Sequence, residues 1–306
     1  METRILDGYR LAVSRKQALQ SRVEQLLAAG KKPVIAAILF TEDSGSVLYT
    51  DLKREMAESL GIGYQVFSYS LQDEAGQVVE KITELSQDSS VTGIIVQKPW
   101  RNLWIQTRGL DAEEGKQQFA QWWESLITAI EPSKDVDGLH PSTLEAIKSG
   151  NWQEQGKVLP ATCKAVLSLL EEALETENLF ATLADRQLKT VILGKSDLLG
   201  QPLFALLQAN NLNSEIIGSS QLNDRIEQGI ALTDADIIVS ATGRTKLVTG
   251  ELIKENSIVI DVGEPQGDVD AASVLGKALV LTPVPGGVGP MTVVSLMENA
   301  LDLVSA

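Results

Sequence analysis

Short apolar runs rich in valine and isoleucine recur along the whole chain, and helical patterns separate them. Such runs are typical of strands that are buried on both faces of a parallel sheet, because helices then cover both sides. They lie at residues 33–40, 64–69, 91–97, 189–193, 213–217, 235–240, 257–263 and 278–281. The alternation predicts an α/β protein with parallel sheets, and 306 residues are enough for two domains of ordinary size.

Charge and residue counts argue against several functions. The chain holds 26 Lys plus Arg against 41 Asp plus Glu, a net charge of −15, and such a surface does not favour nucleic acid or anionic lipid. Its one cysteine, Cys163, allows no internal disulfide, and its one histidine, His140, leaves no Cys/His cluster for zinc. We therefore expect a reduced protein without metal. The absence of a basic-then-apolar start and of a long apolar run predicts a soluble, cytoplasmic protein.

A helical pattern at residues 46–60 follows the first buried run, and Ser46, Tyr49 and Lys53 lie in its first turns. Offsets of three and four residues place these side chains on one helical face. A lysine beside a phenol on a partly covered face can exchange a proton near neutral pH. An ordinary solvated helix face fits the same spacing, so the spacing alone does not decide between the two.

Further polar groups follow other buried runs. Gln97 ends one of them, at the strand end where ligands bind in α/β sheets, although it could equally begin a plain loop. Asp135 and Asp137 flank one valine, and in an extended segment they point to opposite sides, so only one can face a given ligand. We expect His140, just beyond, to make a local hydrogen bond rather than to act in catalysis.

The connection over residues 98–132 is unusually long and contains Trp100, Trp104, Trp122 and Trp123. So much aromatic surface needs a partner, which could be the domain itself, a second subunit or a lid. We favour plain packing and predict that the four tryptophans form a covered patch outside the catalytic centre.

A glycine turn after the run at residues 189–193 contains Gly194, Lys195 and Ser196, and a helix follows. A strand, a glycine turn and a helix start together favour phosphate, although the turn is not the familiar G-x-G-x-x-G and is weak evidence alone. Ser219 comes after the next strand, where a Rossmann unit meets a ribose.

The last buried run leads into a loop with the sequence TPVPGGVGPMT, at residues 282–292. Its prolines make it stiff, and Gly286, Gly287 and Gly289 let a flat ligand lie against the backbone. A plain proline-rich connection would fit this loop equally well if it stood alone.

Taken together, these motifs resemble the bifunctional methylenetetrahydrofolate dehydrogenase/cyclohydrolase family. The matching pieces run from the forties to the end of the chain: Ser46-x-x-Tyr49-x-x-x-Lys53, residues 93–97, 134–138, Pro160-x-Thr162, Gly194-x-Ser196-x-x-x-Gly200-x-Pro202, and residues 261–263, 267–270 and 282–292. The family usually has Pro-Leu-Pro after the glutamine, whereas Lys98-Pro99-Trp100 stands here.

The resemblance implies two domains. A three-layer α/β folate domain would cover residues 1–145 and be completed by a helix over residues 291–306. A Rossmann-type NAD(P)-binding domain with a parallel sheet would cover residues 146–290.

The resemblance also implies roles for single residues. The four catalytic residues, which would also contact the substrate, are Lys53, Tyr49, Gln97 and Asp137. Lys53 would be the general acid/base of the hydrolysis, Tyr49 would pack on the folate, Gln97 would tune the lysine and Asp137 would hold the pterin edge. Further substrate contacts would come from Val96, Pro285, Gly286, Gly287, Val288 and Gly289. The dinucleotide would lie against Gly194, Lys195, Ser196, Ser219 and Glu264.

The implied enzyme oxidises 5,10-methylenetetrahydrofolate with NADP, or with NAD, and hydrolyses the 5,10-methenyl product to 10-formyltetrahydrofolate. It would be a metal-free homodimer of one-carbon metabolism and purine biosynthesis. Lys195, Gly218 and Glu264 depart from the family pattern and leave open a cyclohydrolase with weak or lost dehydrogenase activity. A non-catalytic folate-binding or scaffold protein is a further alternative.

Overall fold

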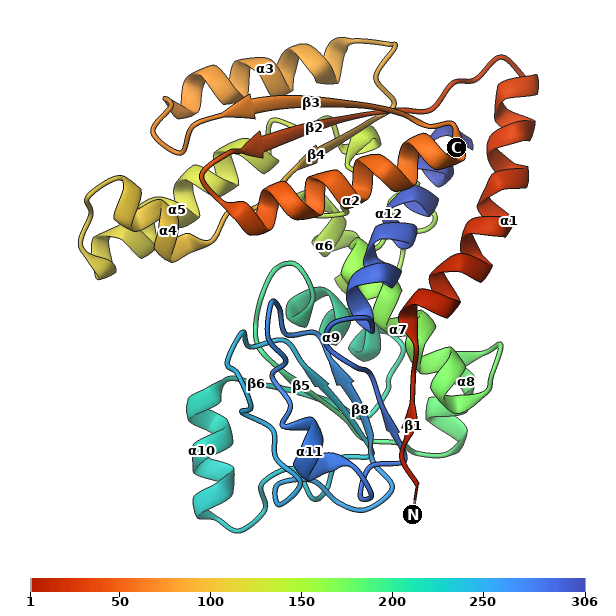
Figure 1. Ribbon diagram of the computed structural model, residues 1–306, viewed down its shortest axis with the longest axis vertical. Helices are drawn as coiled ribbons and strands as arrows, with labels where there is room; N and C mark the ends of the chain where they lie inside the picture. The colour runs from red at the N-terminus through yellow and green to blue at the C-terminus, as the bar shows by residue number, and fades with distance from the viewer. Residues whose placement is uncertain (1, 306) are drawn as a thin grey trace. The chain divides into compact units, whose positions relative to one another are not determined.

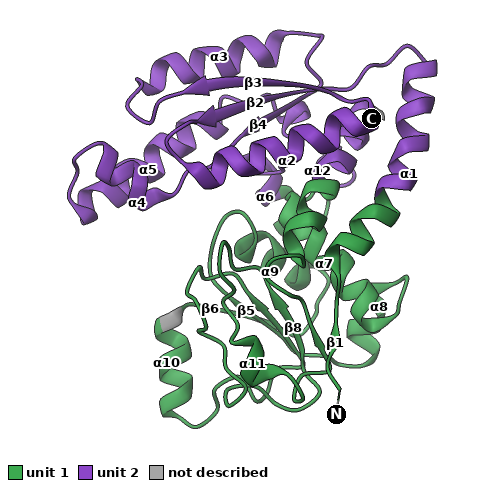
Figure 2. Ribbon diagram, viewed as in Figure 1, with its two compact units in different colours: residues 1–15, 146–151, 159–295 green, residues 16–145, 152–158, 296–306 purple. Residues whose placement is uncertain are grey.

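Two separate parallel sheets organise residues 2–305, which are the residues that the computed structural model describes (Figure 1). Each sheet belongs to one compact unit of the chain (Figure 2). Unit 1 comprises residues 1–15, 146–151 and 159–295, and unit 2 comprises residues 16–145, 152–158 and 296–306. Within residues 2–305 no helix has both the length and the apolar character that a membrane span needs.

The sheet of unit 2 has the strand order β3-β2-β4, with β2 (Val34–Phe40) in the middle. Its neighbours β3 (Gly63–Tyr69) and β4 (Gly93–Val96) both run parallel to it. The predicted strands at residues 33–40, 64–69 and 91–97 are therefore confirmed. The central strand is buried along almost its whole length, as its unbroken apolar sequence predicts.

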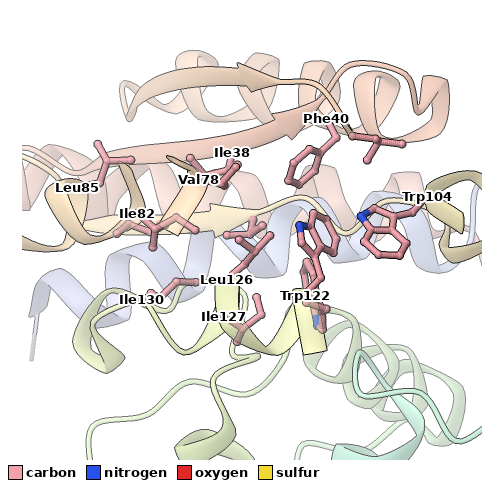
Figure 3. Close-up of a cluster of buried hydrophobic side chains, with 14 of the residues drawn as sticks. Ile38, Phe40, Val78, Ile82, Leu85, Trp104, Trp122, Leu126, Ile127 and Ile130 are labelled. Carbon is pink, nitrogen blue, oxygen red and sulfur yellow. The ribbon is translucent and has the colours of Figure 1, made fainter. Parts of the chain in front are cut away.

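Helices lie against this sheet, and three of them pack on it through apolar side chains. One hydrophobic cluster joins Ile38 and Phe40 of β2 to side chains of α3, α4 and α5 (Figure 3). The helices are α2 (Ser44–Leu60), α3 (Ala75–Gln87), α4 (Arg101–Thr107), α5 (Ala112–Ile127) and the 3-10 turn η1 (Pro132–Lys134). Three more helices have residues in both units: α1 (Gly8–Ala28), α6 (Pro141–Lys148) and α12 (Val288–Ser305).

The tryptophan-rich connection forms α4 and α5, and most of its aromatic side chains belong to the core. The ring of Trp122 lies 5.0 Å from that of Phe40 and 5.4 Å from that of Trp104, centroid to centroid (Figure 3). Trp104, Trp122 and Trp123 are buried, which confirms the prediction of packing for these three. It is wrong for Trp100, which stays 59% exposed because it precedes α4 instead of lying on its inner face.

The sheet of unit 1 has the order β1-β9-β8-β7-β5-β6, and all its strands are parallel. Its strands are β1 (Arg4–Ile5), β5 (Thr190–Leu193), β6 (Ser214–Ile217), β7 (Ile237–Ser240), β8 (Ile258–Asp261) and β9 (Val280–Leu281). From β5 the chain goes outward to β6 and then returns past β5 to β7. The strand order therefore reverses beside β5, and in open α/β sheets ligands bind at such a reversal.

Five helices lie wholly within the described part of unit 1: α7 (Ala161–Leu174), α8 (Leu179–Asp185), α9 (Gly200–Ala209), α10 (Ser219–Glu227) and α11 (Ala271–Val274). Helix α9 begins directly after the glycine turn, as the sequence predicts. Strand β1 is a feature that the sequence did not predict. Its two residues pair with Val280 and Leu281, more than 270 positions away, and no local pattern signals such a pairing.

A pair of tryptophan variants tests the role of the connection. Replacing Trp122 by alanine removes a ring from the core and should lower the free energy of unfolding by about 3–5 kcal/mol. Trp100→Ala removes an exposed ring and should change it by no more than about 0.5 kcal/mol. Urea denaturation of the full chain, followed by circular dichroism, measures both. Equal losses in the two variants would show that the buried cluster does not stabilise unit 2.

Candidate active site

The buried stripe of α2 places a lysine inside unit 2. Its members recur every three or four residues, so that they lie on one face: Ser46, Thr50, Lys53, Ala57 and Leu60. The helix starts at a defined residue because Asp43 caps it, accepting from the backbone N–H groups of Gly45 at 3.0 Å and Ser46 at 3.3 Å. Gly61 ends it in the left-handed conformation, at φ +83°.

The ammonium group of Lys53 meets two other polar side chains. Its Nζ donates to Oε1 of Gln97 at 2.9 Å and lies 4.0 Å from Oδ2 of Asp137, while the residue is only 4% exposed. Gln97 is fixed in turn, because its backbone N–H donates to the Ile38 carbonyl of β2 at 2.9 Å. The structure thus brings together three of the four predicted catalytic residues. A buried, hydrogen-bonded lysine beside one carboxylate can hold or move a proton.

Asp135 and Asp137 point to opposite sides, as their alternation predicts. Asp135 is buried and accepts from the N–H groups of Leu139 at 3.1 Å and His140 at 2.8 Å, and from Oγ1 of Thr143 at 3.2 Å. Burial raises the pKa of Asp135 to about 6 in spite of these bonds. Asp137 faces Lys53 instead. The Nδ1 atom of His140 lies 2.7 Å from Oγ of Ser142, which confirms the local hydrogen bond that we expected of His140.

The valine between these aspartates depends on a glycine that sequence reasoning missed. Val136 is fully buried, and a Cβ added to Gly93 at the start of β4 would lie 2.1 Å from Cγ2 of Val136. Asn299 of α12 also holds this segment, because its Nδ2 donates to the Val136 carbonyl at 3.0 Å. The glycine inside the predicted apolar run at residues 91–97 was the available signal, since glycine within a strand often marks close packing.

Tyr49 and Ser46 complete the predicted face of α2. Tyr49 is half-buried, and Oγ of Ser46 donates to Oδ2 of Asp43 at 3.1 Å and to the Lys98 carbonyl at 3.5 Å. Oδ2 of Asp43 also accepts from the backbone N–H of Trp100 at 2.8 Å. Asp43 therefore joins the start of α2 to the segment that follows Gln97. Its position just before a helical pattern is the sequence signal of a cap.

Val96 is the last residue of β4, and its side chain belongs to the hydrophobic cluster of unit 2. Any contact of Val96 with a ligand would therefore have to come from its backbone. The remaining predicted substrate residues, Pro285 to Gly289, lie in unit 1. The predicted helix start at Met291 is wrong, because α12 already begins at Val288, and Gly286, Gly287 and Val288 are buried.

The start of the chain holds this proline and glycine loop in place. The Gly286 carbonyl accepts from the backbone N–H of Gly8 at 2.9 Å. A Cβ on Gly8 would lie 1.8 Å from the Gly287 oxygen, and one on Gly286 would lie 3.2 Å from the ring of Tyr9. Gly286 itself has φ +105°, a conformation that favours glycine. Gly8 and Tyr9 escaped sequence analysis because nothing local ties them to a loop so far along the chain.

The predicted phosphate turn lies at the end of β5, where the strand order reverses. Gly194 has φ +109°, and a Cβ there would lie 2.3 Å from the Ala241 oxygen, in the loop after β7. A Cβ on Gly200 would lie 2.0 Å from the Gly194 oxygen, so the start of α9 packs directly on the turn. Lys195 is exposed between them. The backbone N–H groups of Lys195 and Ser196 find no acceptor among residues 2–305, which suits a bound phosphate.

The other predicted cofactor residues follow neighbouring strands. Ser219 begins α10, but its side chain lies outside the described residues. Glu264 follows β8, and although the residue is exposed, desolvation around its carboxyl group raises its pKa to about 7. Within the described part of the chain, no three His, Cys, Asp or Glu side chains are grouped as a metal site requires.

Comparison with known proteins agrees with this geometry. Residues 6–114 match the catalytic domain of tetrahydrofolate dehydrogenase/cyclohydrolase, and residues 160–306 match the NAD(P)-binding domain of the same family. The bifunctional protein FolD of Staphylococcus aureus is 32% identical over an alignment of 311 positions. The alignment covers 98% of this chain and 96% of that protein. This chain belongs to the tetrahydrofolate dehydrogenase/cyclohydrolase family.

Solved structures of the family share the whole fold. The FolD enzyme of Campylobacter jejuni is 28% identical with a TM-score of 0.80, and the match covers 99% of each chain. The Trypanosoma brucei enzyme, solved with NADP and an inhibitor, is 26% identical with a TM-score of 0.82, and the match covers 100% of this chain and 98% of that one. The predicted fold class, two α/β domains with parallel sheets, is confirmed.

Two glycines of unit 2 form a matched test of the packing under Asp137. Gly93→Ala places a methyl group against Val136 and should lower the free energy of unfolding by roughly 1–3 kcal/mol. Gly76→Ala, in α3, meets nothing within 4 Å and should be neutral or stabilising by up to about 1 kcal/mol. Urea denaturation compares them. A neutral Gly93→Ala would mean that the Val136 segment shifts freely.

The raised pKa of Glu264 predicts a pH dependence of cofactor binding. Its carboxyl is neutral below pH 7 and negative above it, and a negative charge repels a dinucleotide phosphate. We expect the Kd for NADP to rise roughly 3- to 10-fold between pH 6 and 8, the effect of about 1 kcal/mol from a nearby unit charge. Glu264→Gln should remove this rise. Isothermal titration calorimetry at both pH values measures the Kd. The same rise of Kd with pH in the Glu264→Gln variant would contradict the role of Glu264.

Proposed function

We propose that this chain oxidises 5,10-methylenetetrahydrofolate with NADP and hydrolyses the 5,10-methenyl product to 10-formyltetrahydrofolate. The names of its relatives support both steps, since the Campylobacter jejuni protein is a methylenetetrahydrofolate dehydrogenase/cyclohydrolase and the Trypanosoma brucei one was solved with NADP. The observation that carries the proposal is the buried contact of Lys53 with Gln97 and Asp137 inside the region that matches the catalytic domain.

Lys53 is the proton carrier of the hydrolysis. Water loses a proton as its oxygen bonds to the methenyl carbon, and the ring nitrogen gains one as its bond to that carbon breaks. Both transfers need one group that accepts a proton and returns it: the neutral amine of Lys53 would accept the proton, and its ammonium form would return it. The bond from Lys53 to the Gln97 oxygen fixes the ammonium group in one place and leaves its other N–H groups for substrate. Asp137 accepts hydrogen bonds from the pterin edge, and the half-buried ring of Tyr49 packs on the folate.

Unit 1 binds the dinucleotide. Gly194, Lys195 and Ser196 offer free backbone N–H groups and an ammonium group at the strand reversal, and Ser219 and Glu264 follow the neighbouring strands. When bound, the nicotinamide accepts a hydride from the substrate. The chain itself has to hold and orient both molecules, because hydride transfer depends mainly on positioning. The loop from Pro285 to Gly289, whose ends are the parts open to solvent, contacts the folate.

The remaining predictions about organisation stay part of this proposal. The folate domain would cover residues 1–145 with the helix over residues 291–306, and the dinucleotide domain residues 146–290. We expect a cytoplasmic homodimer. Sedimentation equilibrium at micromolar concentration measures the mass, for which twice 33.0 kDa is expected.

A cyclohydrolase with weak dehydrogenase activity is the second candidate. Glu264 favours it, because a carboxyl group with a pKa of about 7 is partly negative at neutral pH beside the proposed cofactor site. Reduction of NADP that depends on methylenetetrahydrofolate, compared with decay of the methenyl intermediate, separates the two candidates. The buried Lys53 argues against a mere scaffold, because burial of an ammonium group is costly and a protein that only binds folate has no need of a proton carrier.

Lys53→Met tests the assignment of the proton carrier. Methionine keeps most of the volume but cannot carry a proton, so hydrolysis should fall by roughly 10²–10⁴-fold. Dehydrogenase turnover should fall less, and the methenyl intermediate should accumulate in its absorbance band. Lys116→Met, an exposed lysine paired with Glu113 on α5, is the control and should change neither activity. Hydrolysis at the wild-type rate in Lys53→Met would remove Lys53 from the mechanism.

A further inference from the structure

The loop after β7, residues 241–245, lies directly against the proposed phosphate turn. The Ala241 oxygen would be 2.3 Å, and the Thr242 nitrogen 3.5 Å, from a Cβ on Gly194. Strands β5 and β7 are neighbours in the sheet, so both segments leave it at the strand reversal. The loop after β7 therefore lies where a dinucleotide pyrophosphate binds in folds of this kind.

A buried carboxylate holds this loop in one conformation. Asp268 is 0% exposed, and its Oδ2 accepts from Thr242 N at 2.6 Å, Thr242 Oγ1 at 2.9 Å and Ser240 Oγ at 2.9 Å. The hydroxyl of Thr242 in turn accepts from the backbone N–H of Arg244 at 3.2 Å. Asp268 thus fixes the backbone from Ser240 to Arg244.

A second buried carboxylate fixes Asp268 itself. Oδ1 of Asp261 accepts from the backbone N–H groups of Gly263 at 2.9 Å and Asp268 at 3.0 Å, and its Oδ2 accepts from Val269 N at 2.9 Å. Burial raises the pKa of Asp261, so its charged form is costly here. Two buried carboxylates are an expensive way to order a loop that only connects two strands.

The side chain that this loop presents is an unpaired arginine. Arg244 is exposed, and its guanidinium contacts no carboxylate or carbonyl group within residues 2–305. Arg225 of the same unit, in contrast, bonds to Glu215 and Asp234. In a chain of net charge −15, a free guanidinium on a fixed backbone is well prepared to bind an anion.

We propose that Arg244 binds the pyrophosphate of the dinucleotide and that Thr242 and Asp268 position it. The inference rests on the dinucleotide site of the proposed function and adds a residue from the opposite side of the strand reversal. The pyrophosphate is the expected partner because it lies at the β5 turn. A 2′-phosphate lies toward the end of β6, which is on the other side of β5 from β7. Arg244 therefore serves the part that NADP and NAD share, and we expect Lys195, the other exposed cation of this site, to serve the 2′-phosphate.

Binding of both cofactors to the full chain tests the inference. In titration calorimetry, the Kd of the Arg244→Gln variant should rise roughly 10- to 100-fold for NADP and for NAD, by the same factor for both. Lys195→Gln should weaken NADP only. The matched control is Lys246→Gln, in the segment just beyond the loop, because that lysine is exposed and pairs with Asp270 at 3.4 Å. It should leave both constants unchanged.

A double-variant cycle tests the positioning role of Thr242. Thr242→Val keeps the N–H bond to Asp268 but loses the hydroxyl, and should weaken both cofactors, whereas Thr242→Ser should restore binding. If Thr242 acts through Arg244, adding Thr242→Val to Arg244→Gln should cause no further loss. A full additional loss would show that Thr242 acts independently and would overturn its role.

Three results would overturn the assignment of Arg244. An unchanged Kd in Arg244→Gln removes the contact, and a loss confined to NADP moves it to the 2′-phosphate. If the wild-type chain binds neither cofactor, the dinucleotide site of the proposed function fails together with this inference. Normal wild-type binding with an indifferent Arg244→Gln removes the inference alone.

Discussion

The arrangement of unit 2 depends on supplying polar partners to the buried ammonium group of Lys53. An unpaired buried ammonium costs several kcal/mol, so the chain has to bring a hydrogen-bond acceptor and a carboxylate to it. Three segments meet here: α2 carries Lys53, the end of β4 supplies the acceptor Gln97, and the loop after η1 supplies the carboxylate of Asp137. Each segment is fixed separately, by the Asp43 cap, by the sheet bond of Gln97 and by the packing of Val136 on Gly93.

Unit 1 holds its loops by a different device, the close approach of backbone to backbone. Gly194 lies against the loop after β7, Gly200 against Gly194, and Gly8 against Gly287, and each approach leaves no room for a Cβ. The buried carboxylates of Asp268 and Asp261 then accept hydrogen bonds from backbone N–H groups of the loops, which have no partner strand to bond to. The glycines at these approaches are buried or half-buried, so the backbone of the loops is held in place by direct packing.

The sequence predicts those features that have a local period. Strands buried on both faces give unbroken apolar runs, the face of Ser46, Tyr49 and Lys53 follows from helical spacing, and the opposite directions of Asp135 and Asp137 follow from alternation. Contacts between distant segments have no such period. Three contacts depend on how the chain folds back on itself: the pairing of β1 with β9, the packing of Val136 on Gly93, and the hydrogen bond from Thr242 to Asp268. For Trp100 the sequence predicted too much. Four tryptophans in one connection suggested that all four are covered, but Trp100 lies before α4 and stays exposed.

The aromatic connection of α4 and α5 also bears on the active site, although it adds no residue to it. In place of the usual Pro-Leu-Pro of the family, Lys98 follows Gln97, and its ammonium group lies 4.6 Å from the ring of Trp123 and 6.0 Å from that of Phe119. The Lys98 carbonyl accepts from Ser46, and the Trp100 N–H donates to Asp43. The segment after Gln97 is thus tied on one side to the aromatic core and on the other to the start of α2. Because the Gln97 oxygen must stay within hydrogen-bond distance of Lys53, these ties and the fixed φ of Pro99 hold the segment in place.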